Sequence, residues 1–213
     1  GGSWLIKSKG GLMNLVILAA GESKRFGENK LLADINGEIL YKHMEKIYEN
    51  AYNFKNKIIV GRDIHILEYY KLKGFIDIIN NKPELGKSRS IKLAIKALEG
   101  IGCLDSVMFG VCDQPLLSSK TVNKIINEFR NSDKSICSVR YKDRLGNPCI
   151  FSSKWFDELL SLGEDEGGKK IIGNHVDETL FVDIEDGDEL LDIDTKELYY
   201  YILDKIHKNN EKI

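Results

Sequence analysis

Hydrophobic and polar positions follow two alternating periods along the first two thirds of the chain. Short apolar runs rich in β-branched and aromatic residues predict strands, and apolar residues at every third or fourth position between them predict helices. The predicted strands are Leu15–Ala19, Lys57–Val60, Phe75–Ile79, Ser106–Val111, Ser135–Val139 and Cys149–Phe151. The predicted helices cover Ile39–Glu49, Ile64–Lys73, a segment after Ser88, and Ser119–Phe129. This alternation predicts an α/β fold of three layers, a mostly parallel sheet with helices on both faces.

The pattern becomes less regular after Ser135. It indicates a turn at Gly146–Pro148, an acidic and glycine-rich loop at Gly163–Gly168, and a last helix over Thr195–Lys208. The sequence has no internal repeat, low-complexity stretch or flexible linker, so we expect one domain over residues 13–213. Residues 1–12 lack the long apolar centre of a signal peptide, and we interpret them as an expression tag.

Composition narrows the classes of partner. The chain has 213 residues, a formal net charge of −2 and 42% hydrophobic residues. The charges are interspersed, so no basic block draws the chain to nucleic acid or to an anionic membrane. No apolar run approaches the roughly 20 residues of a membrane-spanning helix, and we expect a cytoplasmic protein. The four cysteines show no C-x-x-C spacing, which favours reduced, buried thiols.

The most informative stretch follows the first predicted strand. It reads Leu-Ala-Ala-Gly-Glu-Ser-Lys-Arg-Phe-Gly-Glu-Asn-Lys over residues 18–30. Gly21 lets backbone N–H groups approach phosphate oxygens, while Arg25 offers a planar fork of donors and Lys30 a mobile point charge. An ordinary loop with solvated cations is the alternative, but the fixed spacing over a dozen positions favours a polyphosphate site.

In a second stretch, the apolar run of a predicted strand is followed directly by an aspartate. Asp113 follows the apolar run Val107–Cys112 and precedes Gln114 and Pro115, which breaks the strand. In open α/β sheets ligands bind at the carboxyl ends of central strands. Mg²⁺ takes one or two carboxylates and completes its shell with phosphate oxygens and water, so Asp113 is a candidate metal ligand. A helix cap or turn is the alternative.

The segment Ala-Ala-Gly-x-Ser-x-Arg-x-Gly-x-x-Lys resembles the MobA/MocA-like nucleotidyltransferases, and more closely the molybdenum cofactor cytidylyltransferases among them. The resemblance covers nearly all of residues 14–206 and implies the Rossmann-like nucleotide-diphospho-sugar transferase fold. In that family this segment wraps the triphosphate, and a Gly-x-x-x-Ser loop lies against the nucleotide. The nucleotide-binding residues that the resemblance implies are Leu18, Ala19, Ala20, Gly21, Ser23, Arg25, Lys30, Gly86, Ser88 and Ser90. A helix cap formed by Ser88 or Ser90 is compatible with that role.

The resemblance also implies a second metal carboxylate. The family's D-x-D-T-P-E-D ending appears as Asp-Ile-Asp-Thr-Lys-Glu-Leu over residues 192–198, with Lys196 in the position of the proline. The metal ligand maps to Asp194, and Asp192 is either a solvated turn acid or the ligand in its place. Mg²⁺ on Asp113 and Asp194 is therefore the implied cofactor.

Two further segments resemble the acceptor side of this family. Gly146, Asn147 and Pro148 match its G-x-P-x-x-F segment, and Asp165, Gly167 and Lys169 match its G-D-x-G-[AG]-R loop. Glu164 replaces a glycine of that loop and Lys169 replaces an arginine, which removes a bidentate contact. A surface turn is the alternative interpretation of the loop.

These features predict a Mg²⁺-dependent nucleotidyltransferase with Arg25, Lys30 and Asp113 as catalytic residues. The expected partners are an NTP and a small phosphorylated acceptor, by resemblance the molybdenum cofactor, with a molybdoenzyme receiving the product. Ala20 stands where guanylyl transferases of this fold have glycine, which favours CTP. Guanylyl transfer, transfer to a sugar or polyol phosphate, and a non-catalytic module that delivers the cofactor are the alternatives.

Overall fold

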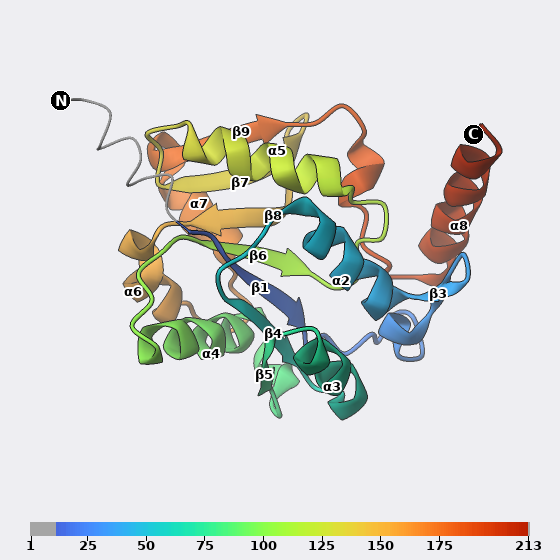
Figure 1. Cartoon of the computed structure of the whole chain (residues 1–213), viewed down its shortest axis with the longest axis horizontal. Helices are drawn as coiled ribbons and strands as arrows, with labels where there is room; N and C mark the ends of the chain where they lie inside the picture. The colour runs from blue at the N-terminus through green and yellow to red at the C-terminus, as the bar shows by residue number, and fades with distance from the viewer. Residues whose placement is uncertain (1–11, 213) are drawn as a thin grey trace.

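The structure, a computed structural model, describes residues 12–212 and is built on one large sheet (Figure 1). Within those residues the sheet has seven strands in the order β5-β4-β1-β6-β8-β7-β9, and β2 and β3 form a separate pair. The strands are β1 (Asn14–Ala19), β2 (Asp34–Ile35), β3 (Glu38–Ile39), β4 (Lys57–Gly61), β5 (Ile76–Ile79), β6 (Val107–Val111), β7 (Ile136–Tyr141), β8 (Arg144–Phe151) and β9 (Thr179–Asp183). Only β8 runs antiparallel to its neighbours in the large sheet.

Helices cover both faces of the sheet because successive residues of each strand point to opposite sides. Leu15 and Ile17 of β1 pack with α2 (Leu40–Ala51), α3 (Ile64–Leu72) and α5 (Ser119–Arg130). Val16 packs with the other layer, which consists of α4 (Lys87–Gly100), α6 (Phe156–Leu160) and α7 (Gly168–Asn174). The helix α8 (Lys196–Glu211) stands at one end of the molecule, beside β3 in Figure 1. The 3₁₀ helices are η1 (Lys30–Leu32), η2 (Pro83–Leu85), η3 (Ser153–Trp155), η4 (Val176–Glu178) and η5 (Gly187–Leu190).

The predicted α/β fold with a mostly parallel sheet is confirmed, and each predicted strand and helix is present with shifted ends. The turn predicted at Gly146–Pro148 is wrong, because these residues lie inside β8. The chain turns instead between β7 and β8, where Lys142 has a φ of 55°. β9 was not predicted, nor were α6 and α7. Residues 1–11 of the expected tag lie outside the described residues.

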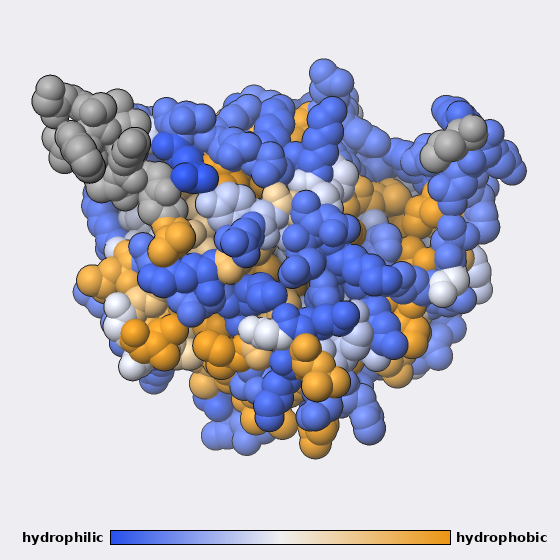
Figure 2. All heavy atoms as spheres, in the orientation of Figure 1, coloured by the Kyte–Doolittle hydropathy of each residue, from blue (hydrophilic) through white to orange (hydrophobic). Residues whose placement is uncertain are grey.

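The surface in Figure 2 is mostly hydrophilic, with apolar side chains along its lower part, where Figure 1 shows α3, α4 and β5. All four cysteines are buried and free, as predicted. Among the helices that the structure describes, none is long and apolar enough to cross a membrane.

Candidate active site

The candidate site lies where the central strands end. β1 pairs in parallel with both β4 and β6, so the carboxyl ends of these three strands meet at one edge of the sheet (Figure 1). The loop that follows β1 carries the predicted phosphate-binding residues, and Asp113 follows β6. Two segments that are far apart in the sequence are therefore brought together by strand pairing.

The loop after β1 is held by a turn and by one buried ring. Ser23 has a φ of 55°, and its carbonyl oxygen accepts hydrogen bonds from the N–H groups of Phe26 and Gly27 at 3.1 and 3.2 Å. Phe26 is buried and packs edge-on against Tyr199 of α8, with ring centroids 5.9 Å apart. The loop ends in η1, which Lys30 begins. This anchoring directs Lys30 toward the ends of β1 and β6.

Lys30 lies between the two predicted metal carboxylates. Its Nζ is 2.6 Å from Oδ2 of Asp113 and 3.3 Å from Oδ1 of Asp194. Arg25 approaches Asp194 from solvent, with Nη2 3.2 Å from Oδ2. The main chain completes the arrangement, because the N–H of Ile193 donates to the carbonyl oxygen of Asp113 at 2.9 Å. The structure thus gathers the predicted catalytic and metal-binding side chains around one point.

Burial and the charges of neighbouring carboxylates set the pKa values of Lys30 and Asp192. Burial would lower the pKa of Lys30, but the charges of Asp113 and then Asp194 outweigh it and leave this pKa raised. Asp192 also lines the site, and burial, followed by the charges of Asp113 and Asp194, raises its pKa to about 7. Asp192 is half-buried and lines the same cavity as Asp113 and Asp194, so it is more than a turn acid in solvent.

A cavity of about 370 Å³ opens on this cluster. Most of the predicted nucleotide-binding residues line it, namely Leu18, Ala19, Ala20, Gly21, Arg25, Lys30, Gly86 and Ser90, together with Asp113 and Asp194. Ser23 lines an adjoining cavity of about 490 Å³ instead. Ser88 is buried and lines neither of these two cavities. The helix α4 begins at Lys87 with Gly86 as its N-cap, so the predicted serine cap is wrong.

A third cavity, of about 320 Å³, lies beside the 370 Å³ cavity and has mostly apolar walls. Its apolar lining includes Phe109, Cys149 and Phe151 of the sheet, Ile91 of α4 and Ile172 of α7. The predicted acceptor-side residues at its edge are Gly146, Asn147, Asp165, Gly167 and Lys169. Pro148 lies in β8 but is not part of this lining.

Asn80 and Lys87 are two of the polar lining residues that the sequence did not predict. Asn80 is fully buried, donates to Ser90 Oγ at 2.9 Å and lines the 370 Å³ cavity. It directly follows β5, so the rule that selected Asp113, a polar residue at the carboxyl end of a parallel strand, could have found it. Lys87 lines both the 370 and the 320 Å³ cavities at their common boundary. Sequence alone gave no signal for Lys87, since an isolated lysine at the start of a helix is common.

A mostly parallel sheet with a glycine-containing loop and paired carboxylates at the carboxyl ends of its central strands belongs to the class of Rossmann-like α/β folds, which bind ligands at that edge. The family model described as "MobA-like NTP transferase domain" matches residues 15–179, and the chain belongs to this family.

Similar proteins agree with this assignment. The chain is 30% identical over 145 residues to a probable molybdenum cofactor guanylyltransferase of Pyrococcus horikoshii, covering 68% of this chain and 71% of the relative. It is 31% identical over 162 residues to the protein of the same name in Thermococcus sibiricus, covering 76% and 78%. A solved nucleotidyl transferase from Methanothermobacter has a TM-score of 0.77 at 19% identity, covering 93% of this chain and 99% of that one, which shows the fold alone.

Proposed function

We propose that this chain transfers CMP from CTP to the phosphate of the molybdenum cofactor and releases pyrophosphate. The convergence of Lys30, Asp113 and Asp194 in the 370 Å³ cavity, with the more apolar 320 Å³ cavity beside it, carries the proposal. Gly21, Arg25 and Lys30 suit the 370 Å³ cavity to a triphosphate, and the apolar walls of the 320 Å³ cavity suit a flat ring system whose phosphate points toward the first cavity. The two archaeal relatives are named for transfer to the same cofactor.

Mg²⁺ fits the donor set at this point. Asp113 and Asp194 are hard oxygen ligands that already converge on one cation, the ammonium of Lys30. Among residues 12–212 no group of three or more His, Cys, Asp or Glu side chains is arranged to hold a metal, so phosphate oxygens and water would complete the shell. When bound, the ion would neutralise charge on the phosphate oxygens.

The chemistry needs no covalent enzyme intermediate. An oxygen of the acceptor phosphate attacks the α-phosphorus, and the bond from that phosphorus to the bridging oxygen breaks, so pyrophosphate leaves with the electron pair. Lys30 and Arg25 neutralise the charge that develops on the leaving group. The loop Gly21–Lys30 orients the triphosphate, and the apolar cavity holds the acceptor in line with it. Positioning and charge neutralisation supply the acceleration.

The test is pyrophosphate release from each NTP in turn, with Mg²⁺ and purified molybdopterin-type cofactor. Release with CTP that depends on the cofactor supports the proposal. Release with a sugar or polyol phosphate instead would move the chain to another branch of the fold. Binding of nucleotide without any release would point to a non-catalytic delivery module.

GMP transfer is the second candidate, because both archaeal relatives are named guanylyltransferases. We favour CTP because Ala20 is buried in the wall of the 370 Å³ cavity. Its β-carbon takes space that a glycine would leave to a purine. A steric preference of this kind is worth roughly 1–3 kcal/mol, so CTP should bind about ten- to a hundredfold more tightly than GTP. Competition titrations with Mg²⁺ and without acceptor measure this ratio. Equal or tighter binding of GTP would replace CMP transfer by GMP transfer.

A further inference from the structure

The segment that carries Asp194 is not part of the sheet. After β9 the chain passes through η5 and an extended stretch before α8 begins at Lys196. Strand pairing therefore does not set the distance between Asp194 and Asp113. Something else must hold this segment, because a misplacement of about 1 Å in an active site can cost a hundredfold in rate.

Besides the backbone bond from Ile193 to Asp113 and the ion pairs of Asp194, the side chain of Gln114 ties this segment to the rest of the site. It follows Asp113 directly and is fully buried. Its Nε2 donates to the carbonyl oxygen of Asn147 at 2.8 Å and to that of Glu189, in η5, at 2.8 Å. One amide group thus uses both of its hydrogens to join β8, on the acceptor side, to the segment that leads to Asp194.

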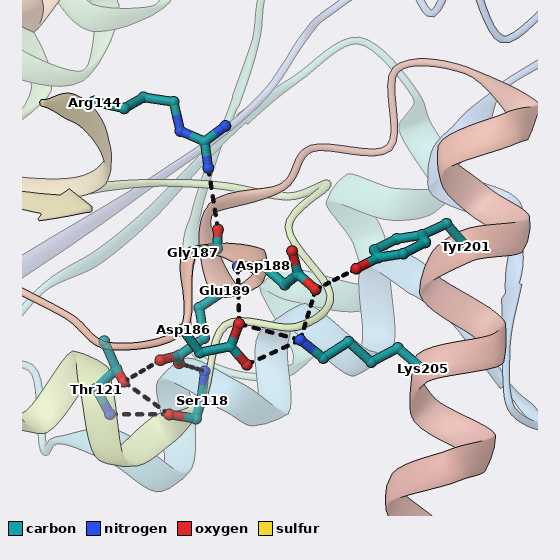
Figure 3. Close-up of polar contacts among 9 residues, drawn as sticks. All are labelled: Ser118, Thr121, Arg144, Asp186, Gly187, Asp188, Glu189, Tyr201 and Lys205. Carbon is teal, nitrogen blue, oxygen red and sulfur yellow. Dashed lines mark hydrogen bonds and ion pairs between the residues drawn. The ribbon is translucent and has the colours of Figure 1, made fainter. Parts of the chain in front are cut away.

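The segment is also held from its outer side (Figure 3). The carboxylate of Glu189 accepts from the N–H of Ser118 at 2.8 Å and from Oγ1 of Thr121 at 2.9 Å, at the start of α5. Lys205 of α8 pairs with Asp188 at 2.6 Å. Gln114 differs from these outer groups because its side chain is fully buried and it directly follows Asp113.

We propose that Gln114 is a positioning residue that fixes the carboxylates of Asp113 and Asp194 relative to the acceptor-side strand. This inference rests on the proposed function for its assignment of metal and acceptor sides. The two carbonyl oxygens that Gln114 satisfies are far apart in the sequence, at residues 147 and 189, and a buried carbonyl without a donor is costly. Removing the amide loosens β8 and η5 relative to each other, with the hydrogen bond from Arg144 to the carbonyl oxygen of Gly187 at 3.2 Å still in place, while the nucleotide loop keeps its own contacts.

The experiment replaces the amide by an apolar side chain of similar length, Gln114→Met. Asn14→Leu is the matched control, because Asn14 is also fully buried and its amide donates to two carbonyl oxygens, of Asp105 and Ser106, at 3.3 and 3.2 Å. Asn14 begins β1, so it lies at the end of the sheet opposite the candidate site. Both variants lose a buried amide, but only Gln114→Met loses it next to Asp113.

Two readouts separate positioning from simple destabilisation. In Gln114→Met, kcat should fall about 30- to 100-fold at a temperature well below unfolding, while the dissociation constant for CTP without metal stays within about threefold of the parent value. In Asn14→Leu both should stay within about threefold. Hydrogen–deuterium exchange should rise in peptides covering residues 144–149 and 186–194 of Gln114→Met, and should not rise there in Asn14→Leu.

Glu189→Ala keeps the proposal testable if Gln114→Met does not fold. It removes the contacts to Ser118 and Thr121 and should lower kcat in the same direction with a smaller rise in exchange over residues 186–194. Unchanged kcat in folded Gln114→Met, or equal losses in Asn14→Leu, would overturn the proposal. If the parent protein releases no pyrophosphate with any acceptor, the proposed function fails. The exchange measurement still decides whether Gln114 holds the two segments together.

Discussion

Replacing Lys30 by methionine should affect nucleotide and metal in opposite directions. The ammonium of Lys30 lies 2.6 Å from Asp113 and 3.3 Å from Asp194, and its side chain is 13% exposed. Without ligand it therefore neutralises the carboxylates that are expected to hold Mg²⁺. With an NTP bound, the same ammonium is expected to turn to the triphosphate.

The magnitude follows from the kind of bond that is lost. A charge-assisted hydrogen bond to a phosphate oxygen contributes about 1.5–3 kcal/mol, so the dissociation constant for a non-hydrolysable NTP should rise roughly 10- to 150-fold in Lys30→Met. The affinity for Mn²⁺ without nucleotide should instead increase severalfold, because the carboxylates lose the cation that competes with the metal.

Calorimetry with the NTP analogue and with Mn²⁺ measures both quantities. Lys46→Met is the matched control, because it removes a lysine from an exposed pair with Glu38 on a helix that does not line the cavity. Its two dissociation constants should match those of the parent protein. An unchanged NTP affinity in Lys30→Met would show that Lys30 does not bind the triphosphate. An unchanged Mn²⁺ affinity would refute the idea that the ammonium and the metal compete for Asp113 and Asp194.

Three further predictions concern single side chains. Asp113→Asn should retain the parent circular dichroism spectrum and lose more than about a hundredfold in pyrophosphate release, because the carboxylate is proposed to hold the metal and does not pack in the core. Gly86→Ala should lower stability by about 1–3 kcal/mol, since Gly86 has a φ of 82° and its new β-carbon would lie 2.7 Å from Oδ1 of Asp165. Thermal melts of Gly86→Ala should show a larger loss than melts of Gly102→Ala, whose new β-carbon meets no described atom within 4 Å. Glu45 is buried with an Oε2 that has no hydrogen-bond partner among residues 12–212, and burial, then Glu49, raises its pKa. Because this carboxyl pKa is raised in the folded state, the free energy of unfolding falls as pH rises through the ordinary glutamate range. Glu45→Gln should therefore be about 1 kcal/mol more stable than the parent near pH 7. Denaturant titrations at lower pH should show that this gain vanishes.

The sequence by itself determined the layers of the fold and the place of the candidate phosphate loop in it. Strand and helix periods are local properties, so runs such as Leu15–Ala19 and the stripe of α4 identified their elements and the faces that they bury. The loop after β1 was recognisable because its glycine and cations fall within a dozen consecutive positions. Asp113 was recognisable because it ends a strand, and strand ends bind ligands in this class of fold.

Only the tertiary structure decided what depends on contacts between distant segments. Gly146–Pro148 reads locally as a turn, yet the chain pairs with β7 on both sides of a register shift at residues 147 and 148, which keeps the segment in β8. Asp192 reads as a turn acid, yet the fold places it in the cavity that Asp113 and Asp194 line, where burial and then the charges of these two carboxylates raise its pKa. The ties from Gln114 to residues 147 and 189 span separations of 33 and 75 positions. No local pattern encodes such pairs, because hydrogen bonds of this kind are selected by the packing of the whole chain.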